Sequence, residues 1–456
     1  MKNNQYINRR EFFKVTGAAA TTTAALAGCI LRKDNSDVGI IPTDKMTYRN
    51  FSSLGDKVSL LGYGCMRWPT IHHPKGQGEI INQEVVNELV DYAIAHGVNY
   101  FDTAPVYIMG QSEQATGIAL KRHPREKFFI ATKMSNIMIP PDFNASVTMY
   151  QNSFKQLQVD YIDYYLLHNL AGFEGERRFE DRFLNNGLLD FLLKEREMGR
   201  IRHLGWSFHG AVEGFKQVLA MHENVHWDFA QIQLNYSDWE HASVINVNAR
   251  YLYEELTKRN IPVTVMEPLL GGRLSNLPVH IVSRLKERNP DNSAASWAFR
   301  YAGSFEGVLT VLSGMTYMEH LQDNIRTYSP LTPLTDEQKE FLYETAELML
   351  QYPVIPCNNC DYCMPCPYGI DIPGVLTHYN KCVNEGNIPK SNADENYRKA
   401  RRTFLTGYDR SVEKIRQADH CTGCEQCVEL CPQKINIPAE LQKVDIFVEQ
   451  LKRESV

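Results

Sequence analysis

The sequence predicts an α/β fold in two parts: a (β/α)8 TIM barrel over residues 47–330 and a small, mainly helical domain over residues 335–456. Length is one reason, because 456 residues exceed what one ordinary domain holds. From about Thr47 to Thr327, short apolar runs also alternate with longer helical patterns, which is typical of βα units around a parallel sheet. Finally, eight of the 11 cysteines fall in two short runs, Cys357–Cys366 and Cys421–Cys431, which points to metal rather than disulfides.

The composition is that of a soluble globular protein, with 43% hydrophobic and 22% charged residues. The net charge of −6 gives no indication of a nucleic-acid partner. No apolar run is long enough to cross a bilayer as a helix of the mature protein.

The first residues resemble two bacterial targeting signals. Arg9 and Arg10, followed by Phe12, Lys14 and a small-residue apolar stretch, resemble a twin-arginine export signal. The sequence ending at Cys29, Leu-Ala-Gly-Cys, resembles a lipobox. We therefore expect a signal over residues 1–28, a polar tether over residues 29–46, and a periplasmic or otherwise extracytoplasmic protein anchored by a lipid on Cys29. The alternatives are an ordinary cleavage site beside an incidental cysteine, and a cytosolic chain with a basic first turn.

One βα unit illustrates how the barrel is predicted. Asn82 is suited to cap a helix, and Gly97 is suited to end it. Residues Val98–Phe101 follow as a strand, which ends at Asp102. Between the caps, one helical face carries five apolar residues: Val86, Leu89, Val90, Ala93 and Ile94.

The same pattern predicts six further strands: Phe128–Thr132, Tyr164–Leu167, Ile201–Gly205, Phe229–Leu234, Ile261–Val265 and Val308–Leu312. A doubly wound sheet is the competing fold, but no Gly-x-Gly-x-x-Gly follows an early strand. Polar residues or glycine stand at or just after the ends of these strands: Asp102, Lys133, His168, Ser207, Gln231 and Gly314. Each alone has a structural explanation, but together they predict an active site on the carboxyl-terminal rim of a TIM barrel.

Three of these residues, together with Tyr107, suit the reduction of a carbonyl. Tyrosine is a weak acid with a pKa of about 10, and a nearby ammonium lowers that pKa. A carboxylate can hold the ammonium, and a neutral histidine can orient the carbonyl. Asp102, Tyr107, Lys133 and His168 offer these groups.

Four segments resemble motifs of the aldo/keto reductase family: Phe101–Tyr107, Phe129–Lys133, Asp160–His168 and Gly199–Gly205. The resemblance covers about 280 residues and implies that Tyr107 is the general acid, that Lys133 and Asp102 tune it, and that His168 orients the substrate. It also implies an NADP(H) or NAD(H) site. Ser207 and Gln231 would bind the nicotinamide amide, and Asp323 and Asn324 the adenosine end, after a loop that contains Gly314.

Three departures from the family concern the nucleotide. The usual Ser-Asn pair is Ser207-Phe208, and the aromatic residue that stacks on the nicotinamide is replaced at Met266 or Val265. Basic residues that bind the 2′-phosphate are replaced near Gly314 and His320. The sequence therefore does not decide between NADP and NAD.

Two cysteine runs form an internal repeat in the second domain. Cys357, Cys360, Cys363 and Cys366 precede Pro367, and Cys421, Cys424, Cys427 and Cys431 precede Pro432. The second run matches the C-x₂-C-x₂-C-x₃-C-P pattern of two-cluster ferredoxins, and the first is one residue shorter. Each run continues into a similar tail, Cys366–Pro373 and Cys431–Pro438, and the repeat resembles the dicluster module of a bacterial aldo/keto reductase branch. We expect two 4Fe-4S clusters in a ferredoxin-like iron–sulfur domain; zinc is the alternative.

In two-cluster ferredoxins the fourth cysteine of each run binds the other cluster. By that rule, Cys431 would join the first three cysteines of the first run, and Cys366 the first three of the second. The shortened first run leaves this exchange open.

The sequence thus predicts an exported oxidoreductase that interconverts a carbonyl and an alcohol with NAD(P)H and passes electrons through two clusters to a redox partner protein. Nicotinamide cofactors are scarce outside the cytoplasm, which keeps a second hypothesis open. In it, the chain is an exported electron-transfer protein whose barrel is a docking or binding scaffold without nicotinamide turnover.

Overall fold

The fold is described from a computed structural model of the chain. The structure describes residues 41–73, 78–136, 142–170, 179–210, 212–240, 248–350 and 354–454. The predicted signal, most of the tether and Cys29 lie outside these residues. Among the described helices, none combines the length and the apolar character that a membrane span requires.

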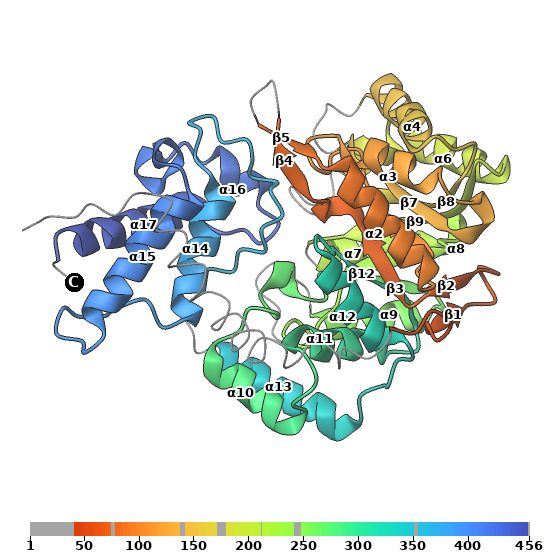
Figure 1. Cartoon of the computed structure of the whole chain (residues 1–456). Helices are drawn as coiled ribbons and strands as arrows, with labels where there is room; N and C mark the ends of the chain where they lie inside the picture. The colour runs from red at the N-terminus through yellow and green to blue at the C-terminus, as the bar shows by residue number, and fades with distance from the viewer. Residues whose placement is uncertain are drawn as a thin grey trace, which may run out of the picture. The chain divides into compact units, whose positions relative to one another are not determined.

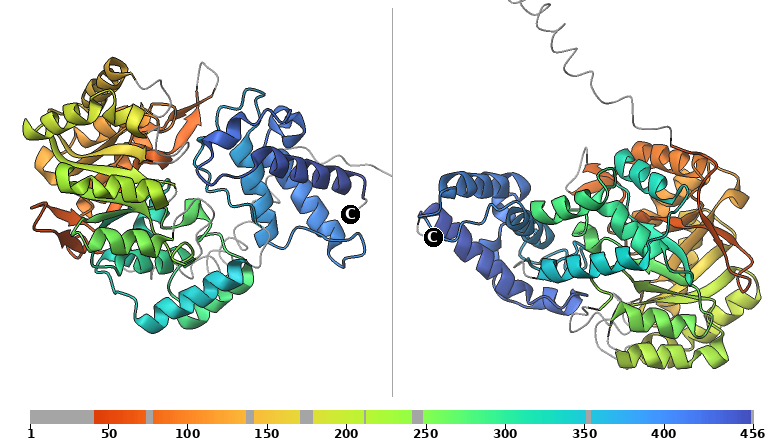
Figure 2. Two further views of the ribbon diagram at one scale, coloured as in Figure 1. Left: turned by 180° about the vertical axis from the view of Figure 1, so that it is seen from behind. Right: turned by 90° about the horizontal axis from the view of Figure 1, so that it is seen from below.

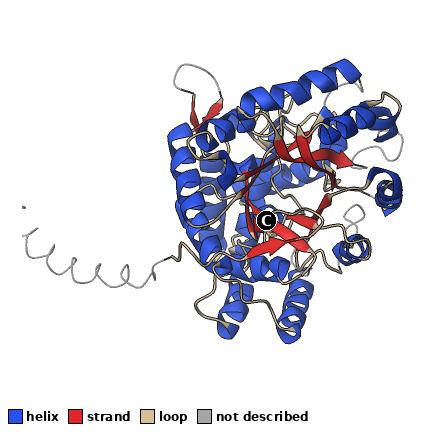
Figure 3. Cartoon of the chain, turned by 90° about the vertical axis from the view of Figure 1, so that its right-hand side faces the viewer, coloured by secondary structure: helices blue, strands red, loops and turns tan. Residues whose placement is uncertain are grey.

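Parallel strands close into an eight-stranded barrel, which confirms the predicted fold class (Figures 1 and 3). Each strand pairs with its neighbours in the order β10-β11-β12-β3-β6-β7-β8-β9, and β9 pairs with β10. The strands are β3 (Leu61–Gly64), β6 (Tyr100–Asp102), β7 (Phe129–Met134), β8 (Ile162–Leu170), β9 (Ile201–Phe208), β10 (Phe229–Gln233), β11 (Val263–Met266) and β12 (Val308–Ser313).

Helices surround the barrel (Figure 3). They are α2 (Gln83–Ala95), α3 (Ser112–Leu120), α4 (Phe143–Leu157), α6 (Leu188–Glu197), α7 (Val212–Ala220), α8 (His222–Val225), α9 (Ala249–Thr257), α10 (Val279–Arg288), α11 (Ala294–Gly303) and α12 (Met318–Tyr328). Helix α2 begins as predicted, because Asn82 accepts a hydrogen bond from the backbone of Val85. After it, Gly97 has the φ of +87° that a glycine readily adopts.

The strand that closes the barrel, β3, is absent from our sequence prediction. Two of its four residues are glycines, which lower strand propensity. The structure explains Gly62, because a Cβ there would lie 2.7 Å from Thr310 Oγ1 and 2.8 Å from the Leu312 side chain. The close packing at β3 thus requires glycine, and glycine is the residue type that makes a strand hard to recognise in the sequence.

Helix α13 (Asp336–Leu350), which we expected to open the second domain, packs against the barrel helices α10 and α11. Arg284 of α10 forms an ion pair of 2.5 Å with Glu344, and the ring of Trp297 of α11 packs against that of Phe341 with centroids 5.8 Å apart and planes tilted by 51°. A capping box begins α13: Thr335 Oγ1 accepts from the Gln338 backbone at 3.2 Å, and Gln338 Oε1 accepts from the Thr335 backbone at 3.2 Å. Two antiparallel ribbons, β1 (Tyr48–Asn50) with β2 (Lys57–Ser59) and β4 (Thr70–His72) with β5 (Glu79–Ile81), flank the barrel.

At the amino-terminal ends of β7, β8 and β9, a buried ionic network joins neighbouring strands. Asp163 accepts hydrogen bonds from Arg125 at 2.5 Å, from the Ile130 backbone at 2.9 Å and from Arg202 at 3.1 Å. Arg202 continues to Asp56 at 3.0 Å. In TIM barrels the amino-terminal end usually contributes to stability, whereas the carboxyl-terminal end holds the active site.

The C-terminal domain contains α14 (Ile372–Asn384), α15 (Tyr397–Ser411), α16 (Gln426–Leu430) and α17 (Ile437–Lys452), of which the three long helices pack together (Figure 2). The sequence repeat becomes a structural repeat. Asp371 caps α14 by accepting from Gly374 at 3.1 Å, and Asn436 caps α17 by accepting from Ala439 at 3.3 Å. In both helices a proline follows in the first turn.

Candidate active site

The four predicted catalytic residues meet at the carboxyl-terminal rim of the barrel. Asp102 ends β6, Lys133 lies in β7, His168 lies in β8, and Tyr107 stands in the loop after β6. Lys133 Nζ donates to Asp102 Oδ1 at 2.5 Å and to the Thr103 carbonyl at 2.8 Å. The ammonium also lies 4.9 Å from the centre of the Tyr107 ring.

Burial governs the pKa values of this group. It raises the pKa of Asp102, and the attraction of Lys133 only partly opposes it. It also raises the pKa of Tyr107 well above the usual value, and the charge of Asp102 adds to that rise. The expected lowering of the Tyr107 pKa by Lys133 is therefore not seen, because Lys133 is engaged with Asp102 and lies over the ring. Tyr107 is held in its protonated form, which can donate a proton.

His168 is held as a neutral imidazole. Burial lowers its pKa well below the usual value, and Lys133 and Arg182 lower it further. Ser135 Oγ lies 2.6 Å from His168 Nδ1, and Arg182 Nη2 donates to the His168 carbonyl at 2.7 Å. If the serine hydroxyl donates to Nδ1, the remaining proton lies on Nε2, on the side where a carbonyl oxygen could accept it.

One cavity of about 430 Å³ connects this tetrad with all five residues predicted to bind the nucleotide: Ser207, Gln231, Gly314, Asp323 and Asn324. That volume lies within the range of small-molecule sites. Gln231 Oε1 is buried and, within the described part of the chain, has no hydrogen-bond partner. An unpaired amide oxygen of this kind fits an amide donor such as the nicotinamide carboxamide.

Three of these five residues already have hydrogen-bond partners for their side chains. Ser207 Oγ accepts from the Asn169 backbone at 2.8 Å. Asn324 donates to Ser313 at 3.0 Å, and Asp323 accepts from the Ser293 hydroxyl at 2.6 Å. The last two contacts fix residues of α12 beside the loop that contains Gly314.

The same cavity is lined by residues that we did not predict, which include Arg67, His209, Glu267, Asn358 and Tyr362. His209 and Glu267 directly follow β9 and β11, so the rule that found Asp102 could have found them. Arg67 follows the missed strand β3. Asn358 and Tyr362 lie within the first cysteine run, and no sequence pattern there indicates that these residues contact the barrel.

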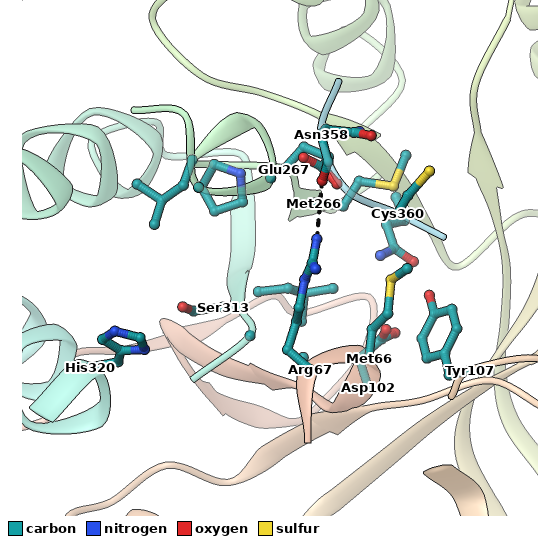
Figure 4. A pocket seen from close by; sticks show the side chains of 18 of the residues that line it. Met66, Arg67, Asp102, Tyr107, Met266, Glu267, Ser313, His320, Asn358 and Cys360 are labelled. Atoms are coloured by element: carbon teal, nitrogen blue, oxygen red, sulfur yellow. Dashed lines mark hydrogen bonds between the residues drawn. The ribbon is translucent and has the colours of Figure 1, made fainter. Parts of the chain in front are cut away.

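Arg67 extends across the cavity (Figure 4). Its Nη2 donates to the Asn358 carbonyl at 3.0 Å. In this view the side chain stands between Ser313 and His320 on one side and Asp102 and Tyr107 on the other. Its methylenes lie so close to Gly314 that a Cβ there would be 2.5 Å from Arg67 Cγ.

Glu267 lies close to Arg67 and Asn358 in the cavity (Figure 4). Burial raises its pKa to about 7, and Arg67 opposes that rise. Its Oε2 is buried, without a hydrogen-bond partner in the portion of the chain that the structure describes. The cavity therefore holds a carboxyl group that titrates near neutral pH beside a guanidinium.

The first cysteine run lies against this cavity, which Cys360 lines. Burial raises the pKa of Cys363, and the nearby thiols of Cys360, Cys357 and Cys431 raise it further. Burial likewise raises the pKa of Cys357 to about 11, a rise to which Cys431 adds and which the backbone N–H of Asn359 opposes. These four thiols thus act on one another, although Cys431 is distant in sequence.

The second run behaves in the same way. Burial raises the pKa of Cys427 to about 11, and the thiols of Cys421, Cys424 and Cys366 add to the rise. Backbone N–H groups bond to the sulfur of Cys431 and oppose the rise of its pKa. Soft thiolates in groups of four with backbone donors fit iron–sulfur clusters. In the described residues, no group of three or more His, Cys, Asp or Glu side chains forms a site for a single metal ion.

The structure is thus a closed (β/α)8 barrel that carries Asp102, Tyr107, Lys133 and His168 at its carboxyl-terminal rim. The sequence matches the Aldo/keto reductase family over residues 60–345, and the chain belongs to that family. Residues 356–436 match the 4Fe-4S dicluster domain, so a ferredoxin-type region follows the barrel.

Several curated proteins are similar to part of this chain. The probable aldo-keto reductase 1 of Glycine max is 28% identical over 194 residues, which are 41% of this chain and 50% of that protein. The L-galactose dehydrogenase of Arabidopsis thaliana is 24% identical over 312 residues, 65% of this chain and 92% of that protein. The chain spans about half or less of the length of several such relatives.

Solved structures agree on the fold. The holo form of aldo-keto reductase AKR11C1 from Bacillus halodurans has a TM-score of 0.52 and 22% identity, and the match covers 66% of this chain and 96% of that one. The thermostable aldo-keto reductase Tm1743 has a TM-score of 0.53 and 21% identity over 66% of this chain and all of that one. At these identities the likeness supports the barrel fold alone.

Proposed function

We propose that this oxidoreductase interconverts a carbonyl and an alcohol with NAD(P)H and exchanges electrons between that site and two 4Fe-4S clusters. The observation that carries the proposal is the shared cavity, which is lined by the tetrad, by the predicted nucleotide-binding residues and by the predicted cluster ligand Cys360. A cluster bound through Cys360 would border the space in which the carbonyl reacts.

In the direction of reduction, each residue of the tetrad has a defined role. His168 donates from Nε2 to the carbonyl oxygen and holds the carbon toward the nucleotide. Tyr107 then gives its phenolic proton to the same oxygen, and burial keeps that proton in place until it is needed. Lys133, held by Asp102, stabilises the phenolate that remains. The nicotinamide, when bound, supplies the hydride.

The nucleotide would extend from Gln231 and Ser207 past Gly314 to Asp323 and Asn324. Gln231 offers its unpaired Oε1 to the carboxamide. The clusters would be held by Cys357, Cys360, Cys363 and Cys431, and by Cys421, Cys424, Cys427 and Cys366. Oxidation of one NAD(P)H releases an electron pair and a proton; that pair would reduce either the carbonyl, as hydride, or two oxidised clusters with one electron each, and not both.

Anaerobic purification tests this function. We expect about eight iron and eight sulfide ions per chain, as two such clusters require. NADPH should bleach the cluster absorbance of the wild type. Tyr107→Phe should lose aldehyde reduction by about 100-fold or more, while NADPH still bleaches its clusters. A protein with no iron, or with clusters that NADPH never reduces, would exclude the proposed coupling.

One observation favours the second candidate, an electron-transfer protein with a barrel scaffold. Arg67 crosses the cavity between the nucleotide-binding residues and the tetrad, and is bonded to Asn358. In that case Tyr107→Phe would leave the oxidation of reduced methyl viologen unchanged, and no aldehyde or ketone would turn over with NADPH.

We also propose export by the twin-arginine route and a lipid anchor on Cys29, on the basis of the sequence alone. Cell fractionation should recover the wild type with membranes in an extracytoplasmic fraction, and mass spectrometry should find an acylated Cys29 at the mature N-terminus. Cys29→Ala should appear in the soluble fraction or stay unprocessed. A wild-type protein that is cytoplasmic with an intact leader would overturn the proposal.

A further inference from the structure

The C-terminal domain contributes a phenol to the catalytic centre. Tyr362 OH lies 3.3 Å from His168 Nε2. The rings of Tyr362 and His168 are 6.5 Å apart in an edge arrangement, and Tyr107 approaches the same imidazole at 6.0 Å. His168 is therefore flanked by one tyrosine from each domain.

The imidazole can serve only one acceptor at Nε2. If the Ser135 hydroxyl donates to Nδ1 across their 2.6 Å contact, the neutral ring carries its proton on Nε2. In the unliganded chain the Tyr362 hydroxyl takes the position that a carbonyl oxygen would need. The phenolic oxygen of Tyr362 and the carbonyl oxygen of a substrate would therefore compete for His168 Nε2.

We propose that Tyr362 is a gating residue of the barrel site, whose hydroxyl occupies the carbonyl-oxygen position at His168 and must be displaced by the substrate. The inference rests on the proposed carbonyl chemistry. It adds that the substrate competes with a residue of the cysteine run, so that binding at His168 moves the segment between the predicted cluster ligands Cys360 and Cys363.

Contacts around Tyr362 explain why it is held in this position. Arg67 donates to the Asn358 carbonyl at 3.0 Å, which fixes the start of the run against the barrel. Gly271 faces the same carbonyl so closely that a Cβ there would lie 2.0 Å from it. The run thus has two attachments to the rim, one at Asn358 and one at Tyr362, and only the second occupies the oxygen position.

Tyr362→Phe tests the gate, because it keeps the ring and removes the hydroxyl. Loss of one neutral competing hydrogen bond should lower the KM for 4-nitrobenzaldehyde by about 2- to 10-fold, with kcat within about twofold of the wild type. Tyr368→Phe is the matched control, since Tyr368 is an exposed tyrosine of the same domain, 50% accessible. It should behave as the wild type. Iron content should be equal in all three proteins.

A second measurement needs no turnover. Diethyl pyrocarbonate acylates neutral imidazoles, so peptide mapping of the oxidised holoprotein reports how open His168 Nε2 is. We expect His168 to react several-fold faster in Tyr362→Phe than in the wild type or Tyr368→Phe, with the partly exposed His123 unchanged. An unchanged rate at His168, or a KM that rises, would overturn the gate. If no aldehyde turns over but His168 still becomes more reactive, the proposed reductase activity fails and the gate stands.

Discussion

Gly271 offers a sharp test of whether the cysteine run is fixed to the barrel. Its φ is +65°, and a Cβ at this residue would stand 2.0 Å from the Asn358 carbonyl oxygen, 2.5 Å from its carbon and 2.5 Å from its Cα. Ordinary contact begins at 3.4 Å, so Asn358 would have to retreat by about 1.4 Å in Gly271→Ala. The bond from Arg67 to Asn358, 3.0 Å long, would not survive that shift.

The adjacent Gly272 is the control. Its φ of +100° is at least as strained for alanine, but a Cβ there meets only Ser275 Oγ at 3.9 Å. Both alanine variants therefore carry the cost of a left-handed residue, about 1–2 kcal/mol, and only Gly271→Ala also loses a bond from a charged donor, worth about 1.5–3 kcal/mol.

Hydrogen exchange measured by mass spectrometry reports the difference locally. Amides of residues 355–363 should exchange about 10- to 100-fold faster in Gly271→Ala than in Gly272→Ala. Equal exchange in the two variants would refute the idea that the Asn358 contact fixes the run to the rim.

Three other predictions follow from the buried charges and thiols. Lys133→Met should lower the free energy of unfolding, measured in urea, by about 3–5 kcal/mol, because the Asp102 carboxylate loses its buried partner. Adding Asp102→Asn should restore stability in the same assay but should not restore turnover. Burial holds the pKa of His209 at about 4, below its usual 6.5, so the unfolded chain binds more protons between these values. Relative to His209→Gln, the wild type should lose up to about 3 kcal/mol of stability as the pH falls from 6.5 to 4, and parallel pH profiles would contradict this. Cys431→Ser should abolish the electron paramagnetic resonance signal of the cluster that also depends on Cys357, and Cys366→Ser that of the cluster that depends on Cys421; loss of the opposite signals would exclude the exchanged pairing.

Much of the barrel was predictable because its sequence signals are local. Helix α2 shows this, since Asn82, the apolar face and Gly97 each act within a few residues. The tetrad was predictable for a related reason: Asp102, Lys133 and His168 lie in or at the end of strands that the apolar pattern already located. All nine predicted catalytic and nucleotide-binding residues line one cavity.

What the sequence could not predict depends on packing between distant segments. Gly62 belongs to a strand only because Thr310 and Leu312 leave no room for a side chain. Tyr362 reaches His168 across 194 positions of sequence, and a tyrosine within a cysteine run carries no sign of such a contact. The pKa of Tyr107 was also out of reach, since it depends on how deeply the phenol is buried.

The ionic network of Asp163, Arg125, Arg202 and Asp56 has a consequence for how such a protein can change. These residues join the strands at the end of the barrel opposite the tetrad, so the closure of the barrel does not depend on what meets the other rim. Insertions or an added domain can alter the carboxyl-terminal rim while the barrel strands keep their arrangement. The C-terminal domain can therefore contact the opposite rim without disturbing the contacts that join these strands.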